Sequence, residues 1–303
     1  MKKLKQYNIN YYLITVILIL LCIPYFGFIN FVINLTDINY ILYFCLILFV
    51  IVTTVTLIYL LYFAYAFNMR LLIKDNYMIT NFTELHESLY VLTKELSKKS
   101  QFRLDYPLIA LLHFKELIAL RKFDEVGTYC NHTKNNLRLH FVIFPTTVLD
   151  LCILSQDIES YIQYFESKPW RRIRKSNVLY NYYYFYFKKD YASALAQLNK
   201  IKPSAQPLSI QNENSLLGKI YYRTNRTEEL NKIMDEIKSY PYNPAVRGLE
   251  HLINTGEEYV ENVPVYLITN LTATINHKPL RLFIVYFIIM LALIGLLISP
   301  IMH

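Results

Sequence analysis

Three long stretches without a charged side chain constrain this sequence most. No Asp, Glu, Lys or Arg occurs between Lys5 and Asp37, and none occurs from there to Arg70. After Arg281 the chain again carries none. A transmembrane helix needs about 20 apolar residues to cross ~30 Å of hydrocarbon, and lipid offers the backbone no hydrogen-bond partner. We therefore predict three transmembrane helices, at about residues 12–32, 41–67 and 282–299.

The overall composition agrees with this prediction. Hydrophobic residues make up 54% of the 303 residues and charged residues 18%, whereas an ordinary water-soluble domain carries about 25% charge. The 6 Gly and 11 Pro exclude a collagen-like chain, and 4 Cys are too few for a disulfide scaffold. The length allows one folded domain besides the membrane segments.

Basic residues flank the three predicted spans on one side of the membrane. They are Lys2, Lys3, Lys5, Arg70, Lys74, His277, Lys278 and Arg281. Because short basic flanks stay in the cytoplasm, we predict a cytoplasmic N-terminus, a cytoplasmic middle segment and a C-terminus outside. The first apolar run is too long for a cleaved signal peptide and lacks a small-x-small site, so we interpret it as retained. The bias toward Lys, Asn, Ile and Tyr suggests an AT-rich, bacterial genome. With the three predicted spans, it leads us to predict a multi-pass protein of the plasma (cytoplasmic) membrane.

The middle of the chain repeats about every 34 residues. Four polar turns, beginning at Arg121, Gln156, Lys189 and Asn225, each lead into a helix with apolar periodicity. The inward-facing residues of these helices are predicted to be Val126, Ser160, Ala194 and Leu230, at intervals of 34, 34 and 36 residues. Twelve residues earlier, a preceding helix contributes Phe114, Val148, Tyr182 and Gly218. A repeated helix–turn–helix unit with this period is typical of α-solenoids.

Two segments carry a resemblance to a known family. They are Leu217-Gly218-x-x-Tyr221 and Tyr191-x-x-Ala194-x-x-x-Leu198. With them, residues 104–242 resemble degenerate tetratricopeptide (TPR-like) repeats, although no unit has the family's first-helix Trp. The resemblance implies a concave surface that binds peptides or helices of other proteins, and it implies no chemistry. We place this surface only as a zone, on the first helices of the second to fourth repeats.

The predicted fold class is therefore all-α: three transmembrane helices plus a cytoplasmic α-solenoid of TPR-like helical hairpins. Residues 1–69 form an N-terminal transmembrane hairpin, 70–278 the helical-repeat domain and 279–303 a C-terminal transmembrane helix. Around the repeats, a helix at 82–97 adds a half-unit, and one at about 245–260 caps the array. The alternative is a non-repetitive bundle. A bundle would pack its first and last helices together, whereas a solenoid helix contacts only its neighbours.

No arrangement of residues typical of catalysis occurs in the sequence. The six Gly never cluster, so a phosphate-binding loop is not expected. Cys130-x-His132 is the closest pair of soft metal ligands, but two further ligands at suitable spacing are missing. No ionisable residue lies inside a predicted span, which argues against an ion path. We predict no enzymatic activity, no cofactor, no metal and no catalytic residue.

Two neighbouring segments are candidates for partner or lipid binding. The first is a basic stretch, of which we select Lys168, Trp170, Arg171, Arg172, Arg174 and Lys175. It could face anionic lipids, grip an acidic partner segment or be a solvated turn; nucleic acid is not expected. The second is the aromatic run at 180–187, where we expect Tyr182 and Phe185 to be core residues. Tyr183 and Tyr186 are the candidates for partner contact.

The leading hypothesis is a membrane-anchored adaptor or scaffold whose TPR-like solenoid binds a protein partner at the membrane. The alternative is an accessory subunit of a membrane transporter or of a peptide export or immunity complex, acting through its transmembrane helices. A membrane-associated enzyme is the third hypothesis, and it lacks a recognisable catalytic group. The sequence predicts neither the identity of the partner nor the oligomeric state.

Overall fold

The computed structural model describes residues 2–33, 40–73, 76, 79–98, 103, 105–133, 143–167, 177–201, 206–237 and 243–277. All regular secondary structure in these ranges is helical, which confirms the predicted all-α class. The chain divides into two units, one containing the two N-terminal helices and the other spanning residues 75–279. The predicted third span, residues 282–299, lies outside the described residues.

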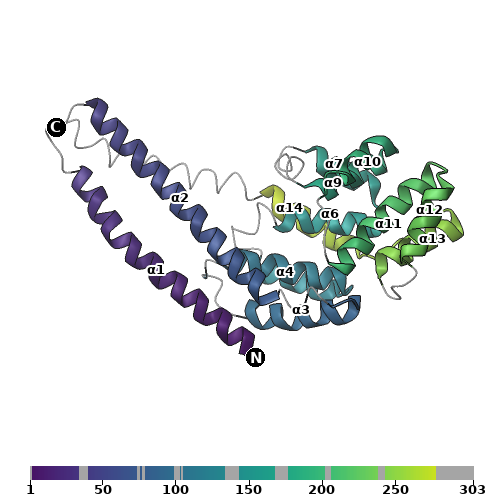
Figure 1. Ribbon diagram of the computed structural model, residues 1–303, viewed down its shortest axis with the longest axis horizontal. Coiled ribbons are helices and arrows are strands. Elements are labelled where there is room, and N and C mark those ends of the chain that lie inside the picture. The colour runs from purple at the N-terminus through teal and green to yellow at the C-terminus, as the bar shows by residue number, and fades with distance from the viewer. Residues whose placement is uncertain are drawn as a thin grey trace. The chain divides into compact units, whose positions relative to one another are not determined.

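The N-terminal unit contains a long antiparallel hairpin of α1 (Lys2–Ile33) and α2 (Tyr40–Ile73), drawn in purple and blue in Figure 1. Polar side chains join the two helices. Asn10 Nδ2 donates to Asn68 Oδ1 at 3.0 Å, and Asn68 Nδ2 donates to the carbonyl oxygen of Tyr7 at 3.2 Å. Interhelical hydrogen bonds of this kind hold apolar helices in a fixed register.

Both predicted N-terminal spans, residues 12–32 and 41–67, fall inside these helices. Pro24 lies within α1 without ending it. Among the residues that the structure describes, however, no helix combines the length and the apolarity needed to cross a membrane.

The second unit contains the remaining described helices, most of which form pairs of consecutive helices. They are α3 (Phe82–Ser97), α4 (Tyr106–Ala119), α5 (Phe123–Thr133), α6 (Ile143–Ser155), α7 (Ile158–Glu166), α9 (Val178–Phe187), α10 (Tyr191–Leu198), α11 (Pro207–Arg223), α12 (Thr227–Ile237), α13 (Pro244–Thr255) and α14 (Val265–His277). Of these, α4–α5, α6–α7, α9–α10 and α11–α12 form the four predicted helical hairpins.

The four hairpins share one turn geometry. In each, the turn residue has a left-handed backbone, with φ of 57° at Arg121, 53° at Gln156, 60° at Lys189 and 56° at Asn225. In the third hairpin, the N–H of Lys189 donates to the oxygen of Tyr186 and that of Asp190 to the oxygen of Phe185, both at 2.9 Å. The other three turns make the same pair of bonds. This Schellman motif satisfies the last carbonyls of the first helix and sets the direction of the second.

Replacing Lys189 by Gly is expected to stabilise the protein by about 0.5–1 kcal/mol. A residue with a Cβ costs roughly 1–2 kcal/mol in the left-handed region, which exceeds the extra backbone entropy that Gly loses, about 0.5–1 kcal/mol. The Lys189 side chain is exposed. Chemical denaturation in detergent measures the change. Lys189→Val should instead destabilise, and a Gly variant no more stable than the Val variant would contradict the role given to this turn.

The repeat is less regular than the sequence analysis predicted. The turn residues lie 35, 33 and 36 positions apart, so the residue equivalent to Val126 in the second hairpin is Tyr161 rather than Ser160. Tyr161 is fully buried, whereas Ser160 is half-buried. The predicted Val148 is likewise replaced by Leu149 at the equivalent position of α6. Both residues are fully buried, which is why the apolar pattern alone could not separate the two registers.

The helix that follows the four hairpins is shorter than predicted. α13 ends at Thr255, not near residue 260, because Gly256 adopts φ 77° and donates its N–H to the oxygen of Leu252 at 2.8 Å. Glycine in the left-handed conformation is a common helix terminator. Residues 257–264 therefore have no helical structure and connect α13 to α14 as an irregular segment.

The last described helix returns to the beginning of the repeat array. α14 packs against α5 and α6, and Figure 1 shows it running alongside α6. Its inner face joins the main core through Leu267, Ile268, Leu271 and Ile275, all buried. Consecutive helices contact each other as in a solenoid, but this return contact is of the kind expected for a bundle. The second unit thus combines both arrangements.

Candidate functional site

A groove runs over the first helices of the hairpins in the second unit. Its volume is about 430 Å³. Its lining residues come from α3, α4, α6, α9, α11 and α13, and from the irregular segment after α13. The binding zone was predicted on the first helices of the second to fourth hairpins. These helices are α6, α9 and α11, and all three line the groove.

An acidic side chain lies within this groove. Asp150 of α6 accepts a hydrogen bond from the Tyr180 hydroxyl at 2.8 Å, and Tyr180 belongs to α9. Burial raises the pKa of Asp150 to about 6, against the opposing effects of Lys115 and of the Tyr180 hydrogen bond. Lys115 is exposed on α4 and also lines the groove. A desolvated carboxylate near a single lysine favours ligands that supply a hydrogen-bond donor.

Side-chain amides form the opposite end of the groove. Asn243 caps α13, since its Oδ1 accepts the N–H of Ala245 at 2.9 Å. Its Nδ2 donates to Gln211 Oε1 at 3.1 Å and to Asn212 Oδ1 at 2.9 Å, both on α11. These bonds fix the start of α13 beside α11, and both Asn212 and Asn243 line the groove. Asn243 is buried and its amide is used within the fold, whereas Asn212 is exposed, so the Asn212 amide can hydrogen-bond a peptide backbone.

The irregular segment after α13 also lines the groove, through Tyr259 and Glu261. Two carboxylates hold this segment in place. Glu258 accepts from Lys219 Nζ at 2.6 Å, and also from the Tyr186 hydroxyl. Glu261 accepts from Arg121 Nε at 2.7 Å, and its own N–H donates to the oxygen of Leu154 at 2.9 Å. Neither residue was predicted from the sequence: Glu258 fell inside the predicted capping helix at about 245–260, and Glu261 pairs with a residue 140 positions away.

The predicted aromatic candidates have different environments. Tyr183 is half-buried and lines the groove. Tyr186 is buried, and its hydroxyl is bonded to Glu258, so it positions the chain's own segment. Tyr182 is fully buried, and Phe185 packs partly buried against the main core, as expected for both.

The predicted basic candidates lie outside the described residues. They are Lys168, Trp170, Arg171, Arg172, Arg174 and Lys175. The structure therefore does not distinguish between lipid contact, partner contact and a solvated turn for this stretch.

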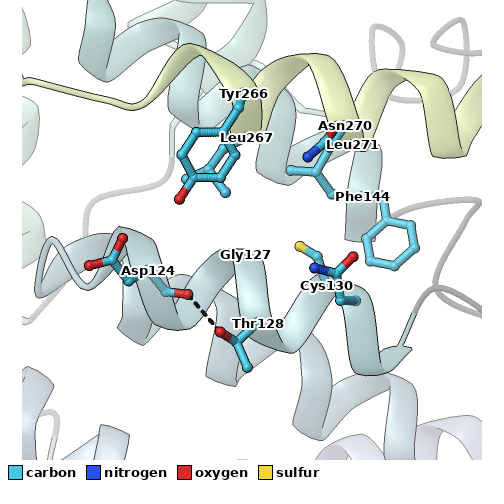
Figure 2. A pocket seen from close by; sticks show the side chains of 10 residues that line it. Asp124, Gly127, Thr128, Cys130, Phe144, Tyr266, Leu267, Asn270 and Leu271 are labelled. Atoms are coloured by element: carbon cyan, nitrogen blue, oxygen red, sulfur yellow. Dashed lines mark hydrogen bonds between the residues drawn. The ribbon is translucent and has the colours of Figure 1, made fainter.

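A second, smaller pocket of about 310 Å³ lies between α5 and α14 (Figure 2). Gly127 faces Leu267 across the interface, and a Cβ at that position would lie 3.0 Å from the Leu267 side chain. Cys130 also lines this pocket, and burial raises the pKa of its thiol to about 12. A thiol that stays protonated is a poor nucleophile and metal ligand. We interpret this pocket as a packing gap between the two helices.

Within the described ranges, no group of three or more His, Cys, Asp or Glu side chains is placed to hold a metal ion. Comparison with known proteins adds no assignment, since no family model, curated protein or solved structure matches this chain. The likeness to TPR repeats therefore stays a resemblance, and the groove is argued from its own geometry.

Proposed function

We propose that this protein is a membrane-anchored adaptor whose helical-repeat unit binds a segment of a protein partner in the groove. The observation that carries the proposal is the lining of the groove, which combines Asp150, Lys115, the amide of Asn212, and Tyr183. Tyrosine offers a large contact area with little side-chain entropy to lose, and amides satisfy a peptide backbone. The groove thus suits an extended or helical segment of another chain.

The N-terminal hairpin is the proposed anchor, with its ends and the helical-repeat unit on the cytoplasmic side. Large apolar side chains are exposed along both helices: Ile9, Tyr12, Leu13, Val16, Ile17, Leu20, Ile23 and Phe31 on α1, and Leu48, Phe49, Val52, Leu60, Phe63, Phe67 and Leu71 on α2. A contiguous apolar surface of this size needs a cover, either lipid or protein. The basic flanks and the charge-free sequence favour lipid.

Site-specific photocrosslinking tests the groove. Tyr183 lines it, whereas the neighbouring Tyr184 is equally half-buried but donates to Glu166 Oε1 at 2.6 Å and is not part of the lining. With a benzoyl-phenylalanine at position 183 in the cells of origin, we expect one dominant crosslinked protein. The same probe at 184 serves as the matched control and should capture much less of it.

The crosslink is expected to depend on the side chains around it. Asp150→Asn should reduce recovery of the captured protein by about tenfold, the effect of removing one central contact. Equal capture from positions 183 and 184 would contradict a groove-bound partner. Capture of a multi-span protein from a probe at Val52, with none at 183, would instead favour the accessory-subunit alternative, because the exposed hairpin face would then be the interface.

A further inference from the structure

The irregular segment at residues 257–262, here called the strap, is held against the helical array by ion pairs and by a backbone hydrogen bond. Its two anchoring carboxylates, Glu258 and Glu261, are three positions apart and meet cations from different parts of the array. Lys219 and Arg223 of α11 contact the first at 2.6 and 3.5 Å, and Arg121 of the α4–α5 turn contacts the second at 2.7 Å. Arg121, Lys219 and Arg223 therefore already bind acidic side chains of a non-helical segment.

Charge dominates the attachment of the strap. Burial raises the pKa of Glu258, but Lys219, Tyr186 and Arg223 outweigh that effect and hold the pKa below its usual value. The other strap residues contribute little apolar contact, since Val260 is 59% exposed and Tyr259 37%. The side chains in these pairs are only 13–29% exposed, so salt screens them less than pairs on the open surface. A largely buried cation left without a partner is costly, so the cations need another carboxylate when the strap leaves.

The strap is also separable from the rest of the fold. Beyond its C-terminal end, Val263 is buried in the main core, and α14 is held there by Leu267 and Leu271. At its other end, α13 is capped at Gly256. Releasing residues 257–262 would therefore leave both flanking helices in place, in the manner of a local opening rather than global unfolding.

We propose that the groove binds an acidic segment of the partner, with carboxylates three residues apart, and that this segment replaces the strap. The cations that the partner uses are Arg121, Lys219 and Arg223, which the strap occupies while no partner is bound. The inference rests on the proposed adaptor function and specifies the chemistry of its partner. Because the strap is tethered to the array, its effective concentration at the three cations is high. A partner segment can replace it only if that segment binds the cations more tightly than the strap does.

Fluorescence anisotropy with a labelled peptide of residues 256–264 tests the proposal on the full-length protein in detergent micelles. In the double variant Glu258→Gln/Glu261→Gln the cations lose their internal partners, so we expect the peptide to bind at least about tenfold more tightly than to the unaltered protein. Raising the salt from about 50 to about 500 mM should weaken this binding strongly. A peptide with Gln at both acidic positions should not bind.

The control variant is Glu166→Gln, which removes a carboxylate paired with Lys188 at 2.7 Å, away from the groove lining. It should give no gain in peptide binding. Equal binding of the acidic and the Gln peptide, or no gain in the double variant, would overturn the proposal. A partner still crosslinked through position 183 in that case would leave the adaptor function standing.

Hydrogen–deuterium exchange on the unaltered protein provides an independent readout that no folding defect can mimic. Peptide at about 1 mM, comparable with the effective concentration of a short tether, should accelerate exchange at residues 257–262. The amides of α11 and α14 should stay protected. Unchanged exchange in the strap at saturating peptide would show that the peptide does not replace it, and the proposal would be wrong.

Discussion

Three arginines on the exposed apolar face of the hairpin are expected to abolish membrane retention of the protein. Leu20, Ile23 and Val52 are 60%, 63% and 56% exposed and lie near the middle of the predicted spans. Each arginine at the centre of a bilayer costs about 2.5–3.5 kcal/mol on insertion scales. In a chain that ends at residue 278, and so lacks the predicted third span, the triple variant Leu20→Arg/Ile23→Arg/Val52→Arg should therefore leave the membrane pellet after alkaline carbonate washing. The same chain without the three substitutions should remain in it.

A matched control tests whether the effect of an added charge depends on its depth in the membrane. Ile9 and Leu71 are exposed to a similar degree, 50% and 49%, but lie outside the predicted spans. Lysine at either position can extend its charge to the interface, so Ile9→Lys/Leu71→Lys should still pellet with the membranes. If the triple arginine variant is retained as firmly as this control, the hairpin does not lie in lipid. Its apolar surface must then be covered by protein.

Local signals in the sequence were sufficient for the helical hairpins. Each turn combines a polar cluster with an apolar helix on either side, and a left-handed turn residue closes the first helix by the same two hydrogen bonds every time. The register of the second hairpin was predicted one residue away, at Ser160 instead of Tyr161. Two adjacent apolar residues, such as Val148 and Leu149, fit the period equally well, and only packing decides between them.

The groove was predicted only as a zone, and its acidic strap was not predicted at all. Glu261 pairs with Arg121 across 140 positions of the sequence, a contact that no local pattern encodes. The end of α13 could have been found from Gly256, because a glycine after an apolar-periodic run commonly terminates a helix. Periodicity over 245–260 was instead extended through it. Recognition of that glycine would have placed Glu258, like Glu261, outside any helix.

One further prediction concerns the glycine that carries the family resemblance. A Cβ on Gly218 would lie 2.5 Å from Leu249 Cδ2 and 3.4 Å from Ile233 Cγ2. Leu249 is fully buried in the core between α11, α12 and α13, so it has little room to move. Overpacking of this kind costs typically 1–3 kcal/mol, which exceeds the helix propensity that alanine adds. We expect Gly218→Ala to destabilise the protein by about 1–2 kcal/mol.

Gly248 provides the opposite case within the same core region. It lies inside α13, and a Cβ there would meet nothing within 4 Å. Gly248→Ala should therefore stabilise by about 1 kcal/mol through helix propensity alone. Since 1 kcal/mol corresponds to about 2–4 °C in a domain of this size, the two variants should melt about 5–10 °C apart by circular dichroism. If both variants melt at a higher temperature than the unaltered protein, α13 can move away from α11 to make room for a side chain at position 218. Close packing at Gly218 would then not be what holds α13 against the last hairpin.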